Sequence, residues 1–491
     1  MRARSRVGRL RGFLDRALFP DAPFPPRITA RRALVCAGIA VLCIAIQLIR
    51  MWSSVPLDSI WAEDGVTWLA DALTRGVFDA LTTTWNGYLQ TSSRLVAEPV
   101  ALLPVAWFAA VMAICGAAIV TGCAFLVWRA SAGHIENPRL RAALAAMVVL
   151  LPVVGVESLD NVTNSIWFLL FASFWVLLWR PTTFARAAAA AGFIFVAALS
   201  NAAIVVFAPL WLLRLIAIRD RRDTIIVAGF AVGTAVQLAF SWNGPAIGEA
   251  GRAETPLFTY SPHWDWSLVP AYAQRIVGGA LGGQRINAFL WVNLGTALEV
   301  AMGAALLAFA AFSLFGALRT RVVVPLTVAA SLGLFLAIGY RRWFPSGIEI
   351  AWPHGSSNTR QAHYMVAPTL LLLSALFVQL DARPRLVSLG AWSRLRVGTV
   401  LVLFVAALVS FDVGESNVRG SPTWSEAVDA GRATCTHTNA SHVELPVAPL
   451  TPLGNFPALI PCSELAQSSM GAAPARTSSH EPRRARAPSW R

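Results

Sequence analysis

Two adjacent carboxylates, Glu63 and Asp64, follow a long apolar segment and precede a stretch with helical hydrophobic spacing. Val66 and Leu69 belong to this spacing, so 65–75 is predicted to be an amphipathic helix on the membrane surface. A carboxylate there could act as a general base on a substrate hydroxyl, and neighbouring acids raise each other's pKa. The alternative is that both acids only favour the first turn of the helix through its dipole.

A second set of polar residues surrounds the end of a short apolar segment that contains Pro152. The set includes Glu157, Asn161 and Asn164. Polar groups at this depth are costly unless they are paired or line a wet cavity. We therefore expect them to line a substrate cavity, and the alternative is that the two asparagines cap their own loop.

Several arginines are candidates for binding an anion. Arg341, Arg342 and Arg360 lie on one predicted outer loop, and a guanidinium suits bidentate binding of a phosphate. Alternatively, Arg341 and Arg342 extend to lipid headgroups just past a span. Arg94 is a further candidate for the cavity, with an interfacial anchor or an ion pair with Glu98 as the alternatives.

The elements that must position these residues are membrane helices. Of the 491 residues, 56% are hydrophobic and 13% are charged, against roughly 25% charged in soluble domains. Apolar blocks of roughly 15 to 30 residues alternate with gaps that carry arginine, as in polytopic membrane proteins. All 40 basic residues are arginine, and positive-inside topology explains their placement better than nucleic-acid binding does.

Eleven apolar segments are predicted to span the membrane, with the N-terminus in the cytoplasm and the C-terminus outside. They are 33–52, 100–128, 142–156, 165–179, 187–199, 202–218, 224–241, 287–318, 322–339, 364–380 and 397–412. The segment 187–218 is divided into two spans because of its flanking charges. With two spans, the gaps 129–141, 180–186, 214–222, 319–321 and 382–396, which hold 15 arginines, all face the cytoplasm.

The predicted fold is an all-α polytopic membrane protein with about eleven transmembrane helices and interfacial helices in its outer loops. Residues 1–32 form a cytoplasmic, Arg-rich N-terminus, and 33–412 form the transmembrane domain, with outer loops 53–99, 242–286 and 340–363. Residues 413–465 form a small extracytoplasmic cap, and 466–491 form a disordered tail. Most acids fall on the outer side, so function is expected at the outer face of a multi-pass protein of the plasma membrane.

Two of the six cysteines lie outside the apolar segments. Cys435 and Cys462 flank a polar stretch that the predicted topology places in an oxidising compartment. We expect a disulfide that staples the cap, with two free thiols as the alternative.

Three sequence blocks resemble those of bacterial membrane proteins with a GT-C-type glycosyltransferase architecture. WAEDG at 61–65, with NGYL at 86–89 and SRLVAE at 93–98, resembles their first outer loop. GVESLDNVTNSIW at 155–167 is similar to a second block. RQAHYMVAP at 360–368 resembles an arginine–tyrosine motif that opens a late span, with His363 where that motif has arginine.

The resemblance implies a transferase that uses a polyprenyl-phosphate sugar as donor and an envelope glycan or lipid as acceptor. It assigns the catalytic acid to Asp64, with Glu63 as the second choice. It also implies that Arg360 contacts the lipid phosphate, with Tyr364 one turn further on and His363 beside it. Tyr88, in the NGYL segment, joins the substrate cavity.

A secondary transporter or flippase of a lipid-linked or polar solute is the alternative function. The sequence shows no clear internal repeat of the kind that transporters contain, which favours the enzyme. It has no GxxxxGK[ST] loop and no lysine to complete one, which disfavours an ATP-driven pump. The sequence shows no zinc-ligand spacing and no defined metal site, and it leaves open whether Mg²⁺ or Mn²⁺ assists. No nucleic-acid partner is expected.

Overall fold

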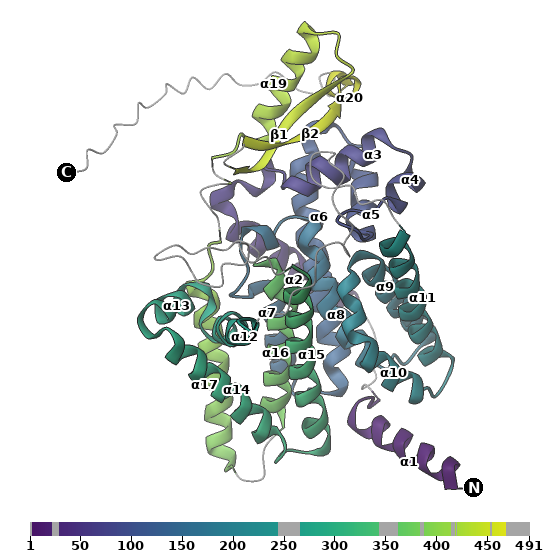
Figure 1. The fold of residues 1–491 in the computed structure, drawn as a ribbon, viewed down its shortest axis with the longest axis vertical. Coiled ribbons are helices and arrows are strands. Elements are labelled where there is room, and N and C mark those ends of the chain that lie inside the picture. The colour runs from purple at the N-terminus through teal and green to yellow at the C-terminus, as the bar shows by residue number, and fades with distance from the viewer. Residues whose placement is uncertain are drawn as a thin grey trace, which may run out of the picture.

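The computed structural model describes residues 2–21, 29–243, 266–342, 362–382, 387–413, 418, 420–451 and 454–467. Within these ranges the chain is nearly all helical (Figure 1). The helices are α1 (Arg2–Ala17), α2 (Ala30–Arg50), α3 (Ala70–Thr74), α4 (Val77–Thr82), α5 (Thr91–Val100), α6 (Phe108–Ala130), α7 (Pro138–Leu150), α8 (Ile166–Leu178), α9 (Phe184–Ser200), α10 (Ala208–Ile216), α11 (Arg221–Asn243), α12 (Leu268–Tyr272), α13 (Gly279–Leu294), α14 (Thr296–Ser313), α15 (Leu318–Arg342), α16 (His363–Asp381), α17 (Leu389–Val409), α19 (Trp424–His437) and α20 (Cys462–Gln467).

Seven helices in the described ranges are long and apolar enough to cross a membrane. They are α2, the stretch Val105–Gly133 that contains α6, α11, α14, α15, α16 and α17. Three shorter apolar helical stretches cover 163–178, 184–200 and 202–216. The chain therefore has the helices of a multi-pass membrane protein, and the count of eleven spans is not confirmed.

Two of the predicted spans differ from the observed helices for local reasons. The predicted span 287–318 is two helices, α13 and α14, because the backbone at Gly295 has a φ of +52° that ends one helix before the next begins. The span predicted at 142–156 is α7, whose 13 residues cover only about 20 Å. A bilayer core is about 30 Å thick, so α7, like the equally short α8, is not among the seven helices that are long enough by themselves to cross it.

The Arg-bearing gaps meet at one end of the bundle. Arg222 Nη1 donates to the carbonyl of Thr182 at 2.7 Å, and Arg180 Nη2 donates to the carbonyl of Ala217 at 2.6 Å. The chain must therefore reverse between 184 and 216, so this segment forms two helices and not one, as the charge argument predicts. At the same end, the carboxylate of Asp381 accepts from the backbone N–H of Glu136 at 2.6 Å.

The opposite end carries a cap, which lies at the top of Figure 1. It consists of α19, α20 and an antiparallel pair of strands, β1 (His442–Thr451) and β2 (Gly454–Pro461). The hairpin corrects the all-α prediction. Val443, Leu445 and Val447 alternate as in a strand, and the prolines of both strands are tolerated because a two-stranded sheet has only edge strands.

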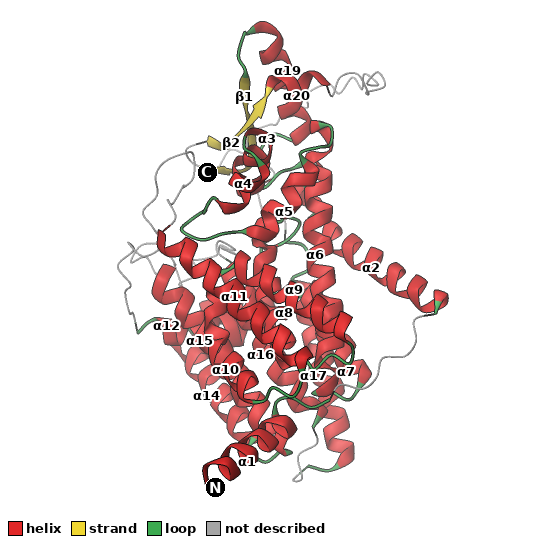
Figure 2. Cartoon of the chain, turned by 90° about the vertical axis from the view of Figure 1, so that its right-hand side faces the viewer, coloured by secondary structure: helices red, strands yellow, loops and turns green. Residues whose placement is uncertain are grey.

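The cap is docked on the loop 53–99, which the sequence predicts to be the first outer loop, and on the start of α6. Trp424 Nε1 donates to the carbonyl of Val105 at 2.8 Å, and Ser425 Oγ donates to Asp58 at 2.6 Å. In Figure 2 the hairpin lies beside α3, and α19 lies above the hairpin. A second apolar core forms between the cap and this loop, separate from the core of the helix bundle.

The predicted interfacial helix at 65–75 has a different environment from the one expected. A π-helix, Asp64–Leu69, continues into α3. Trp68 and Leu69 are buried in the second core, under the cap and against α5. The apolar face of this segment is therefore covered by protein, because the cap supplies the apolar surface that the sequence pattern attributes to the membrane.

Candidate functional site

The loop 155–165, between α7 and α8, is folded around its own asparagines. Asn161 Nδ2 donates to the carbonyl of Glu157 at 2.8 Å, and Asn164 Nδ2 donates to the same carbonyl at 2.7 Å. The loop passes so close to α6 that a Cβ at Gly116 would lie 2.8 Å from the carbonyl oxygen of Asn161. Both amides thus hold the loop in shape, and a contact of theirs with substrate stays a prediction.

Asp64 is held by the other end of this loop. Its Oδ1 accepts from the backbone N–H of Thr163 at 2.9 Å and from the Thr163 hydroxyl at 2.6 Å, and its Oδ2 accepts from the N–H of Val162 at 2.9 Å. The side chain is only 1% exposed. Burial raises the pKa of Asp64 to about 6, against the opposing effect of these hydrogen bonds. Glu63, one residue earlier, is half-buried.

The Thr163 hydroxyl also links Asp64 to a buried cation. Trp68 Nε1 donates to Thr163 Oγ1 at 2.7 Å, and the guanidinium of Arg94 lies over the Trp68 ring, 4.8 Å from its centroid. Arg94 Nη1 forms a salt bridge of 2.7 Å with Asp71, and Asp71 also binds Arg75 at 2.8 Å, the i,i+4 partner. The salt-bridge partner of Arg94 is therefore Asp71 and not Glu98.

Glu157 points to the start of α16, where His363 begins the helix. His363 Nδ1 lies 2.7 Å from Glu157 Oε2, and both side chains are partly exposed, at 16% and 18%. Tyr364 and Trp167 pack beside this pair, with the two rings edge to face and 5.2 Å between centroids. A carboxylate that accepts from Nδ1–H fixes the imidazole orientation and leaves Nε2 as the second functional nitrogen.

A second acid of the loop, Asp160, is buried near Arg50, the last residue of α2. Burial raises the pKa of Asp160 to about 7, and the charge of Arg50 acts in the opposite direction. Arg50 donates to the carbonyls of Val149 at 2.7 Å and Leu151 at 3.0 Å, which fixes the end of α7. Asp160 has a φ of +53°, a conformation that aspartate tolerates better than most residues.

The predicted phosphate-binding arginines are placed only in part. Arg360 lies outside the described residues. Arg341 and Arg342 are the last residues of α15. Ser331 Oγ of α15 donates to the carbonyl of Pro368 in α16 at 2.7 Å, so the end of α15 and His363 at the start of α16 lie at the same end of this helix pair.

Tyr88 follows a tight turn in the first outer loop. Asn86 and Gly87 have φ values of 52° and 76°, and Trp85 and Tyr88 exchange two backbone hydrogen bonds. This is the Asn-Gly signature of a two-residue hairpin turn. The Tyr88 hydroxyl accepts from Gln90 Nε2 at 3.0 Å, and a substrate contact of Tyr88 stays a prediction.

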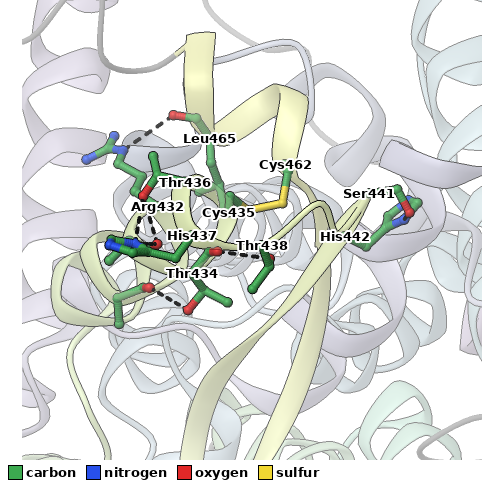
Figure 3. Close-up of a disulfide and its surroundings, with 12 residues drawn as sticks. Arg432, Thr434, Cys435, Thr436, His437, Thr438, Ser441, His442, Cys462 and Leu465 are labelled. Atoms are coloured by element: carbon green, nitrogen blue, oxygen red, sulfur yellow. Dashed lines mark hydrogen bonds between the residues drawn. A yellow bond between two sulfur atoms is a disulfide. The ribbon is translucent and has the colours of Figure 1, made fainter.

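A disulfide joins Cys435 and Cys462, with 5.7 Å between their Cα atoms, which is the pairing that the sequence analysis predicts. Figure 3 shows that it ties α19 to the start of α20. Arg432 Nε donates to the carbonyl of Leu465 at 3.4 Å beside it. The bond closes the cap on itself, because both cysteines belong to cap helices.

Across the ranges that the structure describes, no three or more His, Cys, Asp or Glu residues form a group that could hold a metal ion. Comparison of the chain with protein-family models, with curated proteins and with solved structures gives no match.

Three residues of the site were not singled out from the sequence: Thr163, Asp71 as the partner of Arg94, and Arg50. Thr163 lies inside the 155–167 block, but a threonine in a loop has no distinguishing pattern. Arg50 ends the first span, where an arginine is ordinarily taken to face lipid headgroups. Only the folded chain shows that these polar groups meet.

Proposed function

We propose that this chain is an integral membrane glycosyltransferase of the GT-C type, which moves a sugar from a polyprenyl-phosphate donor to an extracytoplasmic acceptor, an envelope glycan or lipid. One observation carries the proposal. The three sequence blocks that resemble this family are far apart in the chain, yet Asp64 of the first and His363 of the third both bind loop 155–165 of the second. In this proposal, the loop faces outward from the plasma membrane and the N-terminus is cytoplasmic.

The donor phosphate is assigned to the start of α16. His363 is oriented there by Glu157, and the N-terminus of this 19-residue helix carries the positive end of its dipole. Arg341 and Arg342 end the neighbouring helix α15 at the same end of the pair. These groups, with Arg360, supply the positive charge that a lipid phosphate needs.

The acceptor is assigned to the predicted first outer loop, with Asp64 as base and Glu63 as the second candidate. Because Asp64 is 1% exposed and both its oxygens accept hydrogen bonds from residues 162–163, this role requires loop 155–165 to release Asp64 when the acceptor binds. The base removes a proton from the acceptor hydroxyl while its oxygen bonds to the anomeric carbon. The bond from that carbon to the phosphate oxygen breaks, and polyprenyl phosphate leaves with the electron pair. Attack from the face opposite the phosphate inverts the anomeric configuration.

The direct test uses the purified full chain in nanodiscs with a panel of polyprenyl-phosphate hexoses and pentoses that carry a radiolabelled sugar. Envelope lipid and glycan extracts serve as acceptors, and the assay measures label transferred and polyprenyl phosphate released. Transfer with inversion is the expected result. Movement of the intact donor across proteoliposomes without transfer would instead identify a flippase.

Two isosteric variants separate the candidate bases. Asp64→Asn should lower turnover by about 10²–10⁴-fold, while the variant still folds and binds the donor. Glu63→Gln should stay within a few-fold of the wild type. The opposite pattern would move the base to Glu63, and full activity of both variants would contradict the mechanism.

A further inference from the structure

The N-terminal helix α1 (Arg2–Ala17) has an apolar stripe that the protein covers only over its last turn. Leu14 and Ala17 are buried against the Arg-bearing end of the bundle. Leu10 and Phe13, one turn earlier on the same stripe, are 45% and 37% exposed. Leu10 and Phe13 therefore present apolar surface that no described part of the protein covers.

The C-terminal end of α1 is fixed to the bundle by hydrogen bonds and charge as well as by packing, and Arg11 Nη2 donates to the carbonyl of Ile218. Asp15 forms salt bridges with Arg180 at 2.8 Å and with Arg219 at 3.2 Å. His134 Nε2 contacts the carbonyl of Leu18 at 3.0 Å. Figure 1 shows α1 at the end of the bundle opposite the cap, running outward to the N-terminus. These contacts of residues 15–18 fix the position of the exposed part of α1 relative to the bundle.

The charge of α1 indicates what kind of surface binds Leu10 and Phe13. Its 16 residues contain six arginines and a single acid, and that acid, Asp15, is already paired with two arginines of the bundle. Arg9 is exposed beside Leu10. A helix with an exposed apolar stripe flanked by arginine matches a bilayer surface, where apolar side chains enter the acyl boundary and guanidinium groups meet anionic headgroups.

We propose that residues 2–13 of α1, the part before its buried last turn, dock on the surface of the surrounding bilayer through Leu10 and Phe13 and recognise anionic phospholipid headgroups. The spanning helix α15 begins at this end of the bundle and contacts α1, so the helix lies at the level where headgroups are found. This inference does not rest on the proposed enzymatic function.

Hydrogen–deuterium exchange of the full chain tests the proposal, in nanodiscs that each hold one copy, which removes a second copy as the covering partner. We expect amides of residues 2–13 to exchange at least about tenfold more slowly with 30% phosphatidylglycerol than with phosphatidylcholine alone. High salt should abolish the difference, because the Debye length falls from about 10 Å at 0.1 M to about 3 Å at 1 M. Residues 14–19 should exchange equally in both lipids.

A matched pair of variants isolates the charge. Each arginine near an anionic surface contributes about fivefold to binding, so replacing Arg2, Arg6 and Arg9 by Gln should weaken docking about a hundredfold and remove the lipid effect. Arg139→Gln removes an exposed arginine at the same end, outside α1, and should leave the effect intact. Equal exchange of residues 2–13 in both lipids, or an unchanged lipid effect in the triple variant, would overturn the proposal.

Discussion

Asp64 and Glu157 are two carboxylates on opposite sides of the same loop, and they are held in different ways. Asp64 accepts three hydrogen bonds from residues 162–163 and is almost fully buried. Glu157 is partly exposed and has His363 at 2.7 Å. The loop therefore connects a buried carboxylate, Asp64, to a partly exposed one, Glu157.

This difference shows that the residue ranked first as a candidate from the sequence need not be the one that is accessible in the folded chain. The resemblance of the WAEDG block at 61–65 ranks Asp64 first as the catalytic acid, with Glu63 second. In the folded chain, Asp64 shapes the loop as well, since its hydrogen bonds fix the backbone that carries Glu157. Asp64 is therefore expected to affect both stability and turnover, whereas Glu157 is expected to affect donor binding.

The largest effect should come from the titration of Asp64. Its folded pKa is about 6 against an ordinary value of 3.8, so the folded state binds the proton more tightly than the unfolded state does. The carboxyl then stabilises the fold most below pH 3.8, and this contribution is lost as the pH rises through 6. The difference in unfolding free energy between wild type and Asp64→Asn should fall by about 3 kcal/mol from pH 3.5 to 7 in mixed micelles.

A rise of that difference with pH would contradict the expectation. It would mean that the three hydrogen bonds favour the ionised carboxylate more than burial disfavours it. In that case Asp64 would stabilise loop 155–165 only in its ionised form.

Thr163→Val should have the next largest effect. The variant removes a hydroxyl that donates to Asp64 and accepts from Trp68 Nε1, and both partners are buried. The unfolding free energy should fall by about 2–3 kcal/mol. Thr82→Val is the control, because its hydroxyl bonds only carbonyls of its own helix, and it should change stability by less than about 0.5 kcal/mol. Equal losses of unfolding free energy in the two variants would show that the hydrogen bonds of Thr163 to Asp64 and Trp68 contribute no more to stability than a hydroxyl bonded within its own helix.

Arg94→Gln compares the two salt bridges of Asp71, the buried one with Arg94 and the more exposed one with Arg75. Arg94 has a side-chain exposure of 1%, against 34% for Arg75. We expect a loss of about 2 kcal/mol for Arg94→Gln, because Trp68 and Asp71 both lose a buried partner. Arg75→Gln should cost about 0.5 kcal/mol. Chemical unfolding of both variants in mixed micelles measures the ratio, and a larger effect at Arg75 would refute this assignment.

The smallest effect on stability should come from Glu157→Gln, which keeps a hydrogen-bond acceptor for His363 and removes only its charge. The unfolding free energy should change by less than about 1 kcal/mol, while affinity for a fluorescent polyprenyl-phosphate sugar should fall about tenfold, a loss of about 1.4 kcal/mol. Asp79→Asn, an exposed acid on the same end of the molecule, should leave affinity unchanged. Equal affinity of both variants would remove His363 from the donor site.

The sequence predicted the helical membrane architecture, the reversal within 187–218 and the disulfide partners. These features follow from quantities that the chain carries locally: runs of apolar residues, the distribution of arginine, and two cysteines in one polar segment. It did not predict the hairpin in the cap, because short strands with proline give a weak pattern, nor the break at Gly295, which depends on a single backbone conformation.

For the candidate site, the sequence supplied the residue types and three separate blocks, and only the tertiary structure decided how they combine. Asp64 and Thr163 are 99 positions apart, and Glu157 and His363 are 206 apart, so neither contact leaves a periodic signal in the chain. The cap also turned the 65–75 stripe from a membrane-facing surface into a buried one. Hydrophobic spacing specifies that a face is covered, and the fold alone determines whether lipid or protein covers it.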